Sequence, residues 1–399
     1  MSKILIFGAG KIGRSFIAQL FGHAGYQIVF VDSNFKLVTL LNQKKNYNIV
    51  VKGENEKIIP VENIRALLLS EKDAIIKEVC SASVIVTSVG KEGLNSVFPI
   101  LAEGLSARRK VRPTQLIDII IAENIRNAAI LFKKELKKYL KEDFLIDKYV
   151  GLVETSIGKM VPVMLEKDLR EDPLLLFAEE FNTLLVDSNG FISSIPEIEG
   201  LCLKENFKAW VDRKFFIHNL GHASAAYFGF QVVPDEKMLW KVLQNPVVYQ
   251  KTYNAMLQSA KIIQSKYPEE YSMNDLHNHI LDLLDRFRNK CLKDTVYRVG
   301  CDLYRKLGKN DRLAGAIHLG AEQNLPFNFI LDALTAGFQF RASDEKGNIL
   351  DSDKNFYDEM NRIGIKNLFC KITGIKSSTI NKFTCHNDFT LCDFKRKLE

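Results

Sequence analysis

Three polar residues in the second half of the chain, Lys214, Asn219 and His222, have types and spacing suited to acid–base chemistry. On an α-helix turning about 100° per residue they project at roughly 0°, 140° and 80°, so one side of the helix carries all three. A lysine with a lowered pKa could take the proton of a hydroxyl group. The asparagine amide could donate to the oxygen that becomes negative, and the imidazole could orient the same oxygen. An ordinary hydrogen-bonded helix face can show the same spacing. The surrounding sequence must therefore distinguish a catalytic site from a structural helix face.

A metal site is the alternative for this helix. His218 and His222 have the spacing of two zinc ligands on one helix face. The residue after His218 is Asn219, however, and not the glutamate of the metalloprotease motif. A third ligand is not evident nearby, so we expect no metal.

A glycine-rich turn near the N-terminus could bind phosphate groups. The run Gly8-Ala9-Gly10-Lys11-Ile12-Gly13 lies between an expected strand, Lys3–Phe7, and an expected helix from Lys11 to about His23. The first glycine permits the tight turn, the second lets the backbone approach a pyrophosphate, and the third allows close helix–strand packing. Helix N–H groups would then point at the negative charge. Glycine turns also arise for packing alone, so this motif is weak by itself.

Two further features strengthen the expectation of a dinucleotide. A second expected strand, Gln27–Val31, is followed by Asp32, whose carboxylate would accept the adenosine ribose hydroxyls. A carboxylate there repels a 2′-phosphate, so the sequence favours NAD over NADP. Ser88 and Val89 follow a later expected strand and would lie at the same edge of the sheet, although they could equally form an ordinary turn.

The surrounding patterns predict an α/β fold. Apolar runs at 83–88 and 116–122 are continuous, as in buried parallel strands, and helix-like segments lie near 71–79 and 94–105. From about residue 205 the apolar spacing is three and four, which is typical of helices. We therefore expect a doubly wound, Rossmann-type parallel sheet in residues 1–195. A mainly helical substrate domain would follow in residues 196–399.

Composition excludes several classes of protein. The 399 residues carry a formal net charge of +7, spread along the chain without aromatic interleaving, which gives little support to nucleic-acid binding. The seven cysteines are scattered with no C-x-x-C pair, which argues against a disulfide-stabilised scaffold and against a zinc ribbon. No apolar run approaches the 18 or so residues of a membrane span, and we expect a cytoplasmic protein without a membrane partner.

The lysine–asparagine–histidine motif behind an N-terminal dinucleotide fold resembles the polyol-specific long-chain dehydrogenases, a zinc-independent family. Within that family the resemblance is to the members that act on mannitol 1-phosphate. The segments that carry it are Phe7–Arg14, Asp32, Ala122-Glu123-Asn124, Arg213–Ala223, Arg305-Lys306-Leu307 and Asp311-Arg312-Leu313.

This resemblance implies an NAD-dependent interconversion of mannitol 1-phosphate and fructose 6-phosphate. Lys214 would be the general base, Asn219 and Asn124 would polarise the carbonyl oxygen, and His222 would bind a substrate hydroxyl. A cationic cluster along a segment near the family's substrate would suit a phosphate group, although such cations also form ordinary salt bridges. It comprises Arg298, Arg305, Lys306 and Arg312, of which the first three are expected to bind the substrate.

Other functions stay open. Within the family, the chain could act as a mannitol 2-dehydrogenase or as a reductase of fructuronate or tagaturonate. It could also be a homologue that senses NAD without turnover. The sequence departs from the family at Ile157-Gly158-Lys159-Met160, where an acid commonly stands at the second position, and at Leu303-Tyr304, where a proline is common. Both departures concern the substrate more than the reaction class.

Overall fold

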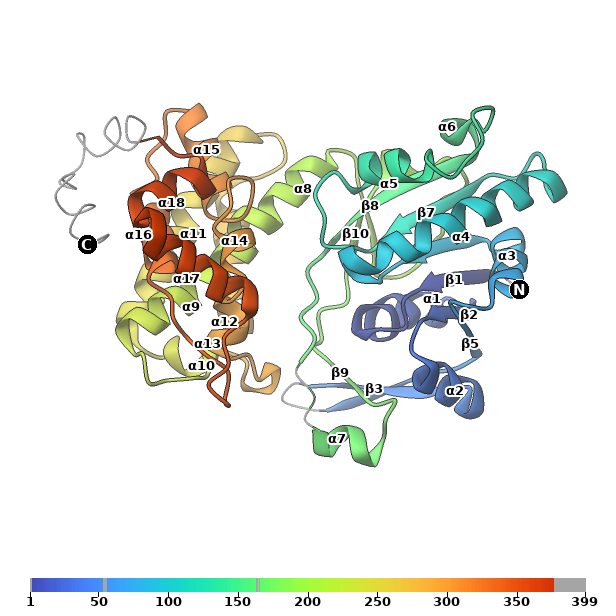
Figure 1. Ribbon diagram of the computed structural model, residues 1–399, viewed down its shortest axis with the longest axis horizontal. Coiled ribbons are helices and arrows are strands. Elements are labelled where there is room, and N and C mark those ends of the chain that lie inside the picture. The colour runs from blue at the N-terminus through green and yellow to red at the C-terminus, as the bar shows by residue number, and fades with distance from the viewer. Residues whose placement is uncertain (1, 53–55, 163, 165, 377–399) are drawn as a thin grey trace. The chain divides into compact units, whose positions relative to one another are not determined.

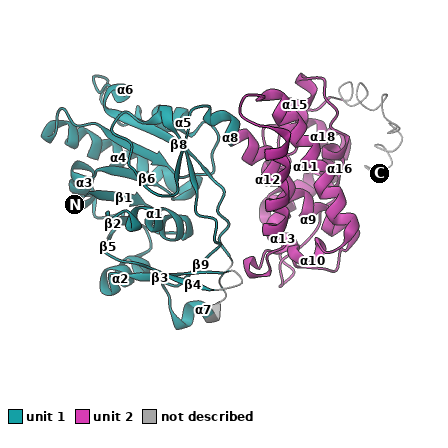
Figure 2. Cartoon of the chain, turned by 180° about the vertical axis from the view of Figure 1, so that it is seen from behind, with its two compact units in different colours: residues 1–210 teal, residues 211–399 magenta. Residues whose placement is uncertain are grey.

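The structure is a computed structural model that describes residues 2–52, 56–162, 164 and 166–376. The chain forms two compact units, residues 1–210 and 211–399 (Figures 1 and 2). Each unit has its own architecture and is described in turn.

The first unit is built on a large, mainly parallel sheet. Among the described residues eight strands pair in the order β11-β10-β8-β7-β6-β1-β2-β5. From β5 to β8 this is the strand order of a dinucleotide-binding fold, in which all six strands are parallel and the order of the strands reverses between β1 and β6. The strands are β1 (Lys3–Phe7), β2 (Gln27–Asp32), β5 (Ile64–Leu68), β6 (Val84–Thr87), β7 (Ile117–Ile121), β8 (Val150–Ile157), β10 (Leu184–Asp187) and β11 (Leu201–Lys204).

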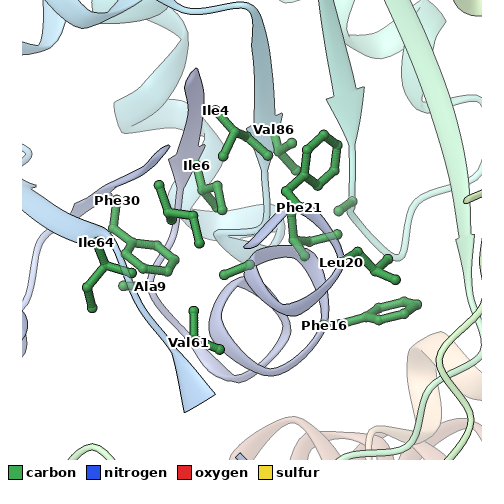
Figure 3. Close-up of a cluster of buried hydrophobic side chains, with 14 of the residues drawn as sticks. Ile4, Ile6, Ala9, Phe16, Leu20, Phe21, Phe30, Val61, Ile64 and Val86 are labelled. Atoms are coloured by element: carbon green, nitrogen blue, oxygen red, sulfur yellow. The ribbon is translucent and has the colours of Figure 1, made fainter. Parts of the chain in front are cut away.

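Helices cover both faces of this sheet, because successive side chains of each strand point to opposite faces. Ile4 and Ile6 of β1 belong to the apolar core on one face, and Leu5 and Phe7 to the core on the other. In Figure 3, Phe16, Leu20 and Phe21 lie around the helix that packs near Ile4 and Ile6. The helices of this unit are η1 (Gly13–Ile17), α1 (Ala18–His23), α2 (Phe35–Lys44), α3 (Lys72–Ser81), α4 (Gly90–Val111), α5 (Ala128–Leu136), α6 (Ile146–Tyr149), α7 (Glu166–Glu171) and η2 (Ser188–Gly190).

Two parts of the first unit differ from the sequence prediction. Strand β10 pairs antiparallel with β8, so the sheet is not parallel throughout. A second sheet of three described strands has the order β4 (Lys57–Val61), β3 (Tyr47–Val51), β9 (Leu176–Ala178). Strands β3 and β4 are neighbours in the chain and pair antiparallel, whereas β9 comes from more than a hundred residues later. The sequence patterns predicted none of these three strands.

The second unit is helical, as predicted. Its central helix, α9 (Leu220–Val232), is buried along most of its length and packs against α11, α13 and α16. Helix α8 (Phe207–Arg213) runs across the division between the units. The remaining helices are η3 (Lys214–Asn219), α10 (Leu239–Val242), α11 (Pro246–Lys266), α12 (Met273–Phe287), η4 (Lys290–Leu292), α13 (Val296–Gly300), α14 (Leu303–Lys306), α15 (Ala314–Glu322), α16 (Asn328–Phe338), α17 (Asp351–Ile363) and α18 (Ile365–Thr373).

The fold class predicted from the sequence is thus confirmed, a Rossmann-type sheet followed by a mostly helical part. The polar stretch 343–350 forms no helix or strand, and α17 begins at Asp351. None of the helices in the described part of the chain combines the length and apolar character that a bilayer crossing requires.

Candidate active site

A cavity of about 280 Å³ opens at the point of the large sheet where the strand order reverses. The carboxyl ends of β1, β2 and β6 meet there, and residues from the start of α4 close one side. The lining residues are Phe7, Gly8, Gly10, Val31, Asp32, Ser33, Leu69, Ser88, Val89, Gly93, Ser96 and Val97. The sequence predicted five of these, Gly8, Gly10, Asp32, Ser88 and Val89. It did not identify Leu69 or the α4 residues, since their only signal is their position after a strand or on a helix.

The glycines of the first turn have the geometry that a phosphate cradle needs. Gly8 has φ +101°, a conformation that side chains disfavour, and a Cβ there would lie 2.4 Å from the Ser88 carbonyl oxygen. A Cβ on Gly13 would lie 2.0 Å from the Gly8 carbonyl oxygen, so this glycine allows the helix to pack on the strand. A Cβ on Gly10 would meet no atom of the described residues within 4 Å. The open space beside Gly10 therefore lies in the cavity, where a pyrophosphate would approach the backbone.

Asp32, at the end of β2, is hydrogen-bonded to the glycine turn that follows β1. Asp32 accepts the backbone N–H of Ala9 at 2.8 Å through Oδ2 and that of Asn34 at 2.9 Å through Oδ1. Each carboxylate oxygen has a second lone pair, so both can still accept a ribose hydroxyl. Lys11 is exposed and Ile12 half-buried, and neither lines the cavity.

A buried carboxylate organises the neighbouring turn. Glu123, which follows β7, accepts the backbone N–H groups of Val89 at 2.8 Å and Gly90 at 2.9 Å. Burial raises the pKa of Glu123, and these two hydrogen bonds oppose that shift. In the sequence Glu123 appeared only within the family segment Ala122-Glu123-Asn124, with no role of its own. Its neighbour Asn124 is exposed, at the same end of β7.

The lysine motif of the second unit lies on one continuous helix whose middle is wider than an α-helix. Residues Lys214–Asn219 form a π-helical turn, η3, between α8 and α9. Such turns are rare and occur frequently at functional sites. The prediction assumed regular α-helical spacing, so the projection angles given for Lys214, Asn219 and His222 do not apply as stated. A second π-helical turn, η1, begins at Gly13 of the glycine turn.

Lys214 has the lowered pKa that a general base needs. Burial, and then the charge of Arg312, lower the pKa of Lys214 to about 8. Arg312 is itself buried, and its Nη1 donates to the backbone carbonyl of Asn219 at 3.5 Å. Part of the Lys214 amine is thus neutral near physiological pH, and only the neutral form can accept a proton.

Asn219 and His222 offer the two other polar groups of the motif. The Nδ2 atom of Asn219 is buried and has no hydrogen-bond partner within the described residues. A buried donor without a partner costs about 1–3 kcal/mol, so a ligand oxygen there would be favourable. His222 Nε2 lies 3.1 Å from Oδ2 of Asp294, and Arg298 binds the other oxygen of that carboxylate.

Comparison with known proteins identifies the family. Residues 2–200 match the Mannitol dehydrogenase Rossmann domain, and residues 206–368 match the Mannitol dehydrogenase C-terminal domain. The chain belongs to the mannitol dehydrogenase family. It is 32% identical over 312 residues to mannitol-1-phosphate 5-dehydrogenase of Geobacillus stearothermophilus, an alignment covering 77% of this chain and 79% of that one.

Solved structures support the same fold. A substrate-free D-sorbitol dehydrogenase has a TM-score of 0.75 at 16% identity, with 99% of this chain and 94% of that one covered. A Pseudomonas fluorescens mannitol 2-dehydrogenase in complex with NAD and D-mannitol also has a TM-score of 0.75, at 14% identity, with 100% and 93% covered. These likenesses concern the fold alone.

Membership of the mannitol dehydrogenase family confirms the predicted reaction class. The chain is an oxidoreductase that acts on a CH–OH group with NAD as cofactor. The cavity of the first unit fits such a cofactor, because the glycine turn leaves open space beside Gly10 and Asp32 faces the same cavity. In the described part of the chain no three or more His, Cys, Asp or Glu side chains are grouped so as to hold a metal ion.

The cations expected near the substrate differ in their surroundings. Arg298 and Arg305 have half-exposed side chains and pair with carboxylates, Arg298 with Asp294 and Arg305 with Asp302. Lys306 is 6% exposed and donates to the Val299 carbonyl at 2.7 Å. Burial, and then the charge of Arg312, lower the pKa of Lys306 to about 7.

Gly158 stands at the position where the family resemblance predicted an acid, and its nearest side chain is aromatic. A Cβ on Gly158 would lie 3.4 Å from the ring of Phe181. The next residue, Lys159, is buried and donates to Gln19 at 3.0 Å and to Asn182 at 2.7 Å. Burial lowers the pKa of Lys159 to about 8, so the chain contains a second buried lysine comparable to Lys214.

Proposed function

We propose that this protein interconverts mannitol 1-phosphate and fructose 6-phosphate with NAD and without a metal ion. The observation that supports this substrate most directly is the 32% identity to mannitol-1-phosphate 5-dehydrogenase over more than three quarters of the chain. The expected chemistry follows from the polar groups of η3 and α9 together with the cavity of the Rossmann domain.

The bound cofactor would supply a hydride acceptor for the oxidation. Lys214 in its neutral form would take the hydroxyl proton of the polyol on Nζ, and in the protonated form it would return that proton in the reverse reaction. Asn219 would donate from Nδ2 to the reacting oxygen as its negative charge develops. Asn124 is proposed to assist the same oxygen and His222 to bind a substrate hydroxyl.

The cofactor is expected to be held by the cavity of the Rossmann domain. The backbone at Gly8, Gly10 and the start of the following helix would accommodate the pyrophosphate, and Asp32 would accept the ribose hydroxyls. The other residues proposed for this part of the site are Ala9, Lys11, Ile12, Gly13, Ser88 and Val89.

A phosphorylated substrate is favoured by the cations of α13 and α14. Lys306 has no carboxylate within salt-bridge distance among the described residues, whereas Arg298 and Arg305 each have one. A phosphate group would place a compensating charge beside a buried amine. We therefore assign Lys306 the principal contact and Arg298 and Arg305 secondary ones.

A substrate panel tests the proposal. The purified enzyme is given mannitol 1-phosphate, sorbitol 6-phosphate, mannitol and sorbitol with NAD and with NADP. In the reductive direction it is given fructuronate and tagaturonate with NADH, and NADH or NADPH absorbance is followed throughout. We expect kcat/KM to be highest for mannitol 1-phosphate with NAD. Activity confined to free polyols, or to fructuronate and tagaturonate in the reductive direction, would assign another substrate within the family. Absence of turnover with all of them would favour a protein that only senses NAD.

A further inference from the structure

The imidazole of His222 is held by a carboxylate that the sequence motif does not contain. Its Nε2 lies 3.1 Å from Oδ2 of Asp294, whose side chain is only 5% exposed. Oδ1 of the same carboxylate accepts a hydrogen bond from Nη2 of Arg298. Both oxygens of Asp294 are therefore engaged, and the guanidinium compensates the negative charge.

The loop that carries Asp294 is fixed on both sides. The backbone carbonyl of Asp294 accepts the N–H of Leu239 at 2.9 Å, and the N–H of Val296 donates to the carbonyl of Lys237 at 2.8 Å. Between them, Thr295 accepts a backbone N–H of α13 on its hydroxyl. The carboxylate thus has little freedom to leave the imidazole.

The plane of the imidazole is also fixed. The ring of Phe287, the last residue of α12, stacks on that of His222 with centroids 4.8 Å apart and planes 18° apart. Phe287 is almost fully buried. Stacking from one face and the carboxylate at one edge together determine which ring nitrogen faces outward.

The protonation of His222 follows from its surroundings. Burial, and then the charges of Arg298, Lys306, Arg312 and Arg286, hold the pKa of His222 well below its usual range, so the ring is neutral. A neutral imidazole carries one N–H, and a carboxylate can only accept, so the proton is on Nε2. Nδ1 then presents a lone pair. It has no hydrogen-bond partner in the part of the chain that the structure describes, and the side chain is 18% exposed.

We propose that Asp294 and Arg298 are positioning residues that fix the Nε2–H tautomer of His222, so that Nδ1 accepts a hydrogen bond from a substrate hydroxyl next to the reacting carbon. This inference rests on the proposed function for the nature of the substrate. It does not rest on it for the tautomer, which is a property of the free protein.

Asn219 and His222 would then have different roles in substrate binding. A carbonyl or alkoxide oxygen needs a donor, and Asn219 Nδ2 is one, whereas His222 Nδ1 is an acceptor. His222 therefore does not orient the reacting oxygen itself, as the sequence pattern alone allowed. It selects substrates that carry a hydroxyl on the carbon next to the reacting one, as sugar alcohols do.

The substitution Asp294→Asn should reverse the tautomer. Arginine has only donors, so Arg298 must keep the amide oxygen, and the amide NH₂ is then turned toward His222. Nε2 can meet that NH₂ only as an acceptor, which moves the proton to Nδ1. The group that faces the substrate becomes a donor, and a substrate hydroxyl loses its acceptor.

The direct test is the histidine side-chain ¹⁵N spectrum of the full-length protein without substrate, with the His222 signals assigned by a His222→Gln variant. We expect the wild type to show unprotonated Nδ1 and protonated Nε2 between pH 6 and 8, which are about the limits over which histidine ordinarily titrates. Asp294→Asn should show the opposite tautomer. The matched control Asp285→Asn, whose side chain is 77% exposed, should leave the wild-type pattern. A protonated Nδ1 in the wild type would overturn the proposal.

Kinetics test the consequence for the substrate. Asp294→Asn and Asp294→Ala, checked for folding by thermal unfolding, should lower kcat/KM about 10- to 100-fold while the Kd for NAD is unchanged. With an analogue that lacks the hydroxyl next to the reacting carbon, the variants and the wild type should have similar kcat/KM. An equal loss with both substrates would indicate a merely structural residue and contradict the proposal. If mannitol 1-phosphate proves not to be a substrate but the tautomers are as expected, only the proposed function fails.

Discussion

The backbone N–H of Ala9 donates to Oδ2 of Asp32 at 2.8 Å, so the acid at the end of β2 holds the glycine turn at the end of β1. The carboxylate therefore contributes to the cradle before any ribose is bound. Asp32 also contacts the N–H of Asn34, the residue that caps α2.

Asp32→Asn should weaken NAD binding more than it weakens the fold. The amide oxygen can retain one backbone contact, but the charged acceptor is lost, and a hydrogen bond to a charged group contributes about 1.5–3 kcal/mol. We expect the Kd for NAD, measured by calorimetry, to rise roughly 10- to 150-fold. The Kd for NADP should rise less, because the repulsion of its 2′-phosphate is removed. An unchanged preference between the two would contradict the assignment of Asp32.

Two glycine substitutions should separate packing from ligand binding. Gly13→Ala places a methyl group 2.0 Å from the Gly8 carbonyl oxygen, so the free protein should lose about 1–3 kcal/mol or more of unfolding free energy. The methyl group of Gly10→Ala meets no atom of residues 2–52, 56–162, 164 and 166–376 within 4 Å, so the unfolding temperature of this variant without ligand should match the wild type. Its methyl group would enter the cavity and raise the Kd for NAD. Normal NAD affinity in Gly10→Ala would argue against a pyrophosphate at this turn.

Asn219→Ala should lower kcat strongly while it changes the unfolding temperature little. The Nδ2 atom is buried and has no hydrogen-bond partner in the part of the chain that the structure describes, so removing it relieves a cost in the free protein while it deletes the proposed donor to the reacting oxygen. We expect kcat to fall about 10²- to 10³-fold and the unfolding temperature to stay close to that of the wild type. A kcat within twofold of the wild type would remove Asn219 from the mechanism.

Binding of a sugar phosphate should be accompanied by proton uptake. Burial and Arg312 lower the pKa of Lys306 to about 7, and a phosphate beside the amine would raise it again. Calorimetric titrations with mannitol 1-phosphate in two buffers of different ionisation enthalpy should therefore show uptake of part of a proton between pH 7 and 8. Lys306→Met should abolish the uptake and raise KM for the phosphate ester, with little change in KM for mannitol. Equal uptake in the variant would place the phosphate elsewhere.

Most of the Rossmann sheet was predictable because its inner strands are buried on both faces. Strands β6 and β7 are continuous apolar runs, and β1 is followed at once by glycines whose function depends on a strand before them. Strand β9 has three residues and pairs with β3 across more than a hundred positions, so its pairing depends on tertiary structure. The antiparallel pairing of β10 with β8 likewise has no local signal.

The candidate site was predictable where it follows a local motif and not where it depends on distant residues. The motif gave Lys214, Asn219 and His222, but the π-helical turn that changes their relative directions has no simple periodic signature. Asp294 lies 72 residues from its histidine. The sequence indicated Arg312 only as a member of the cationic cluster and of a family segment, and its effect on the pKa of Lys214 depends on the folded structure.

The central claim is that Lys214 is the general base, and the pH dependence of kcat for polyol oxidation tests it most directly. Wild-type kcat should rise with pH and level off above about 8, because the neutral amine accepts the proton, whereas reduction should be faster below that pH. Lys159→Met, which removes the other buried lysine with a pKa of about 8, should keep this profile even if it lowers stability. In Lys214→Met the oxidation rate should fall by orders of magnitude, and the rise near pH 8 should disappear while the Kd for NAD is preserved. A Lys214→Met enzyme that retains the wild-type rate and pH profile would contradict the account.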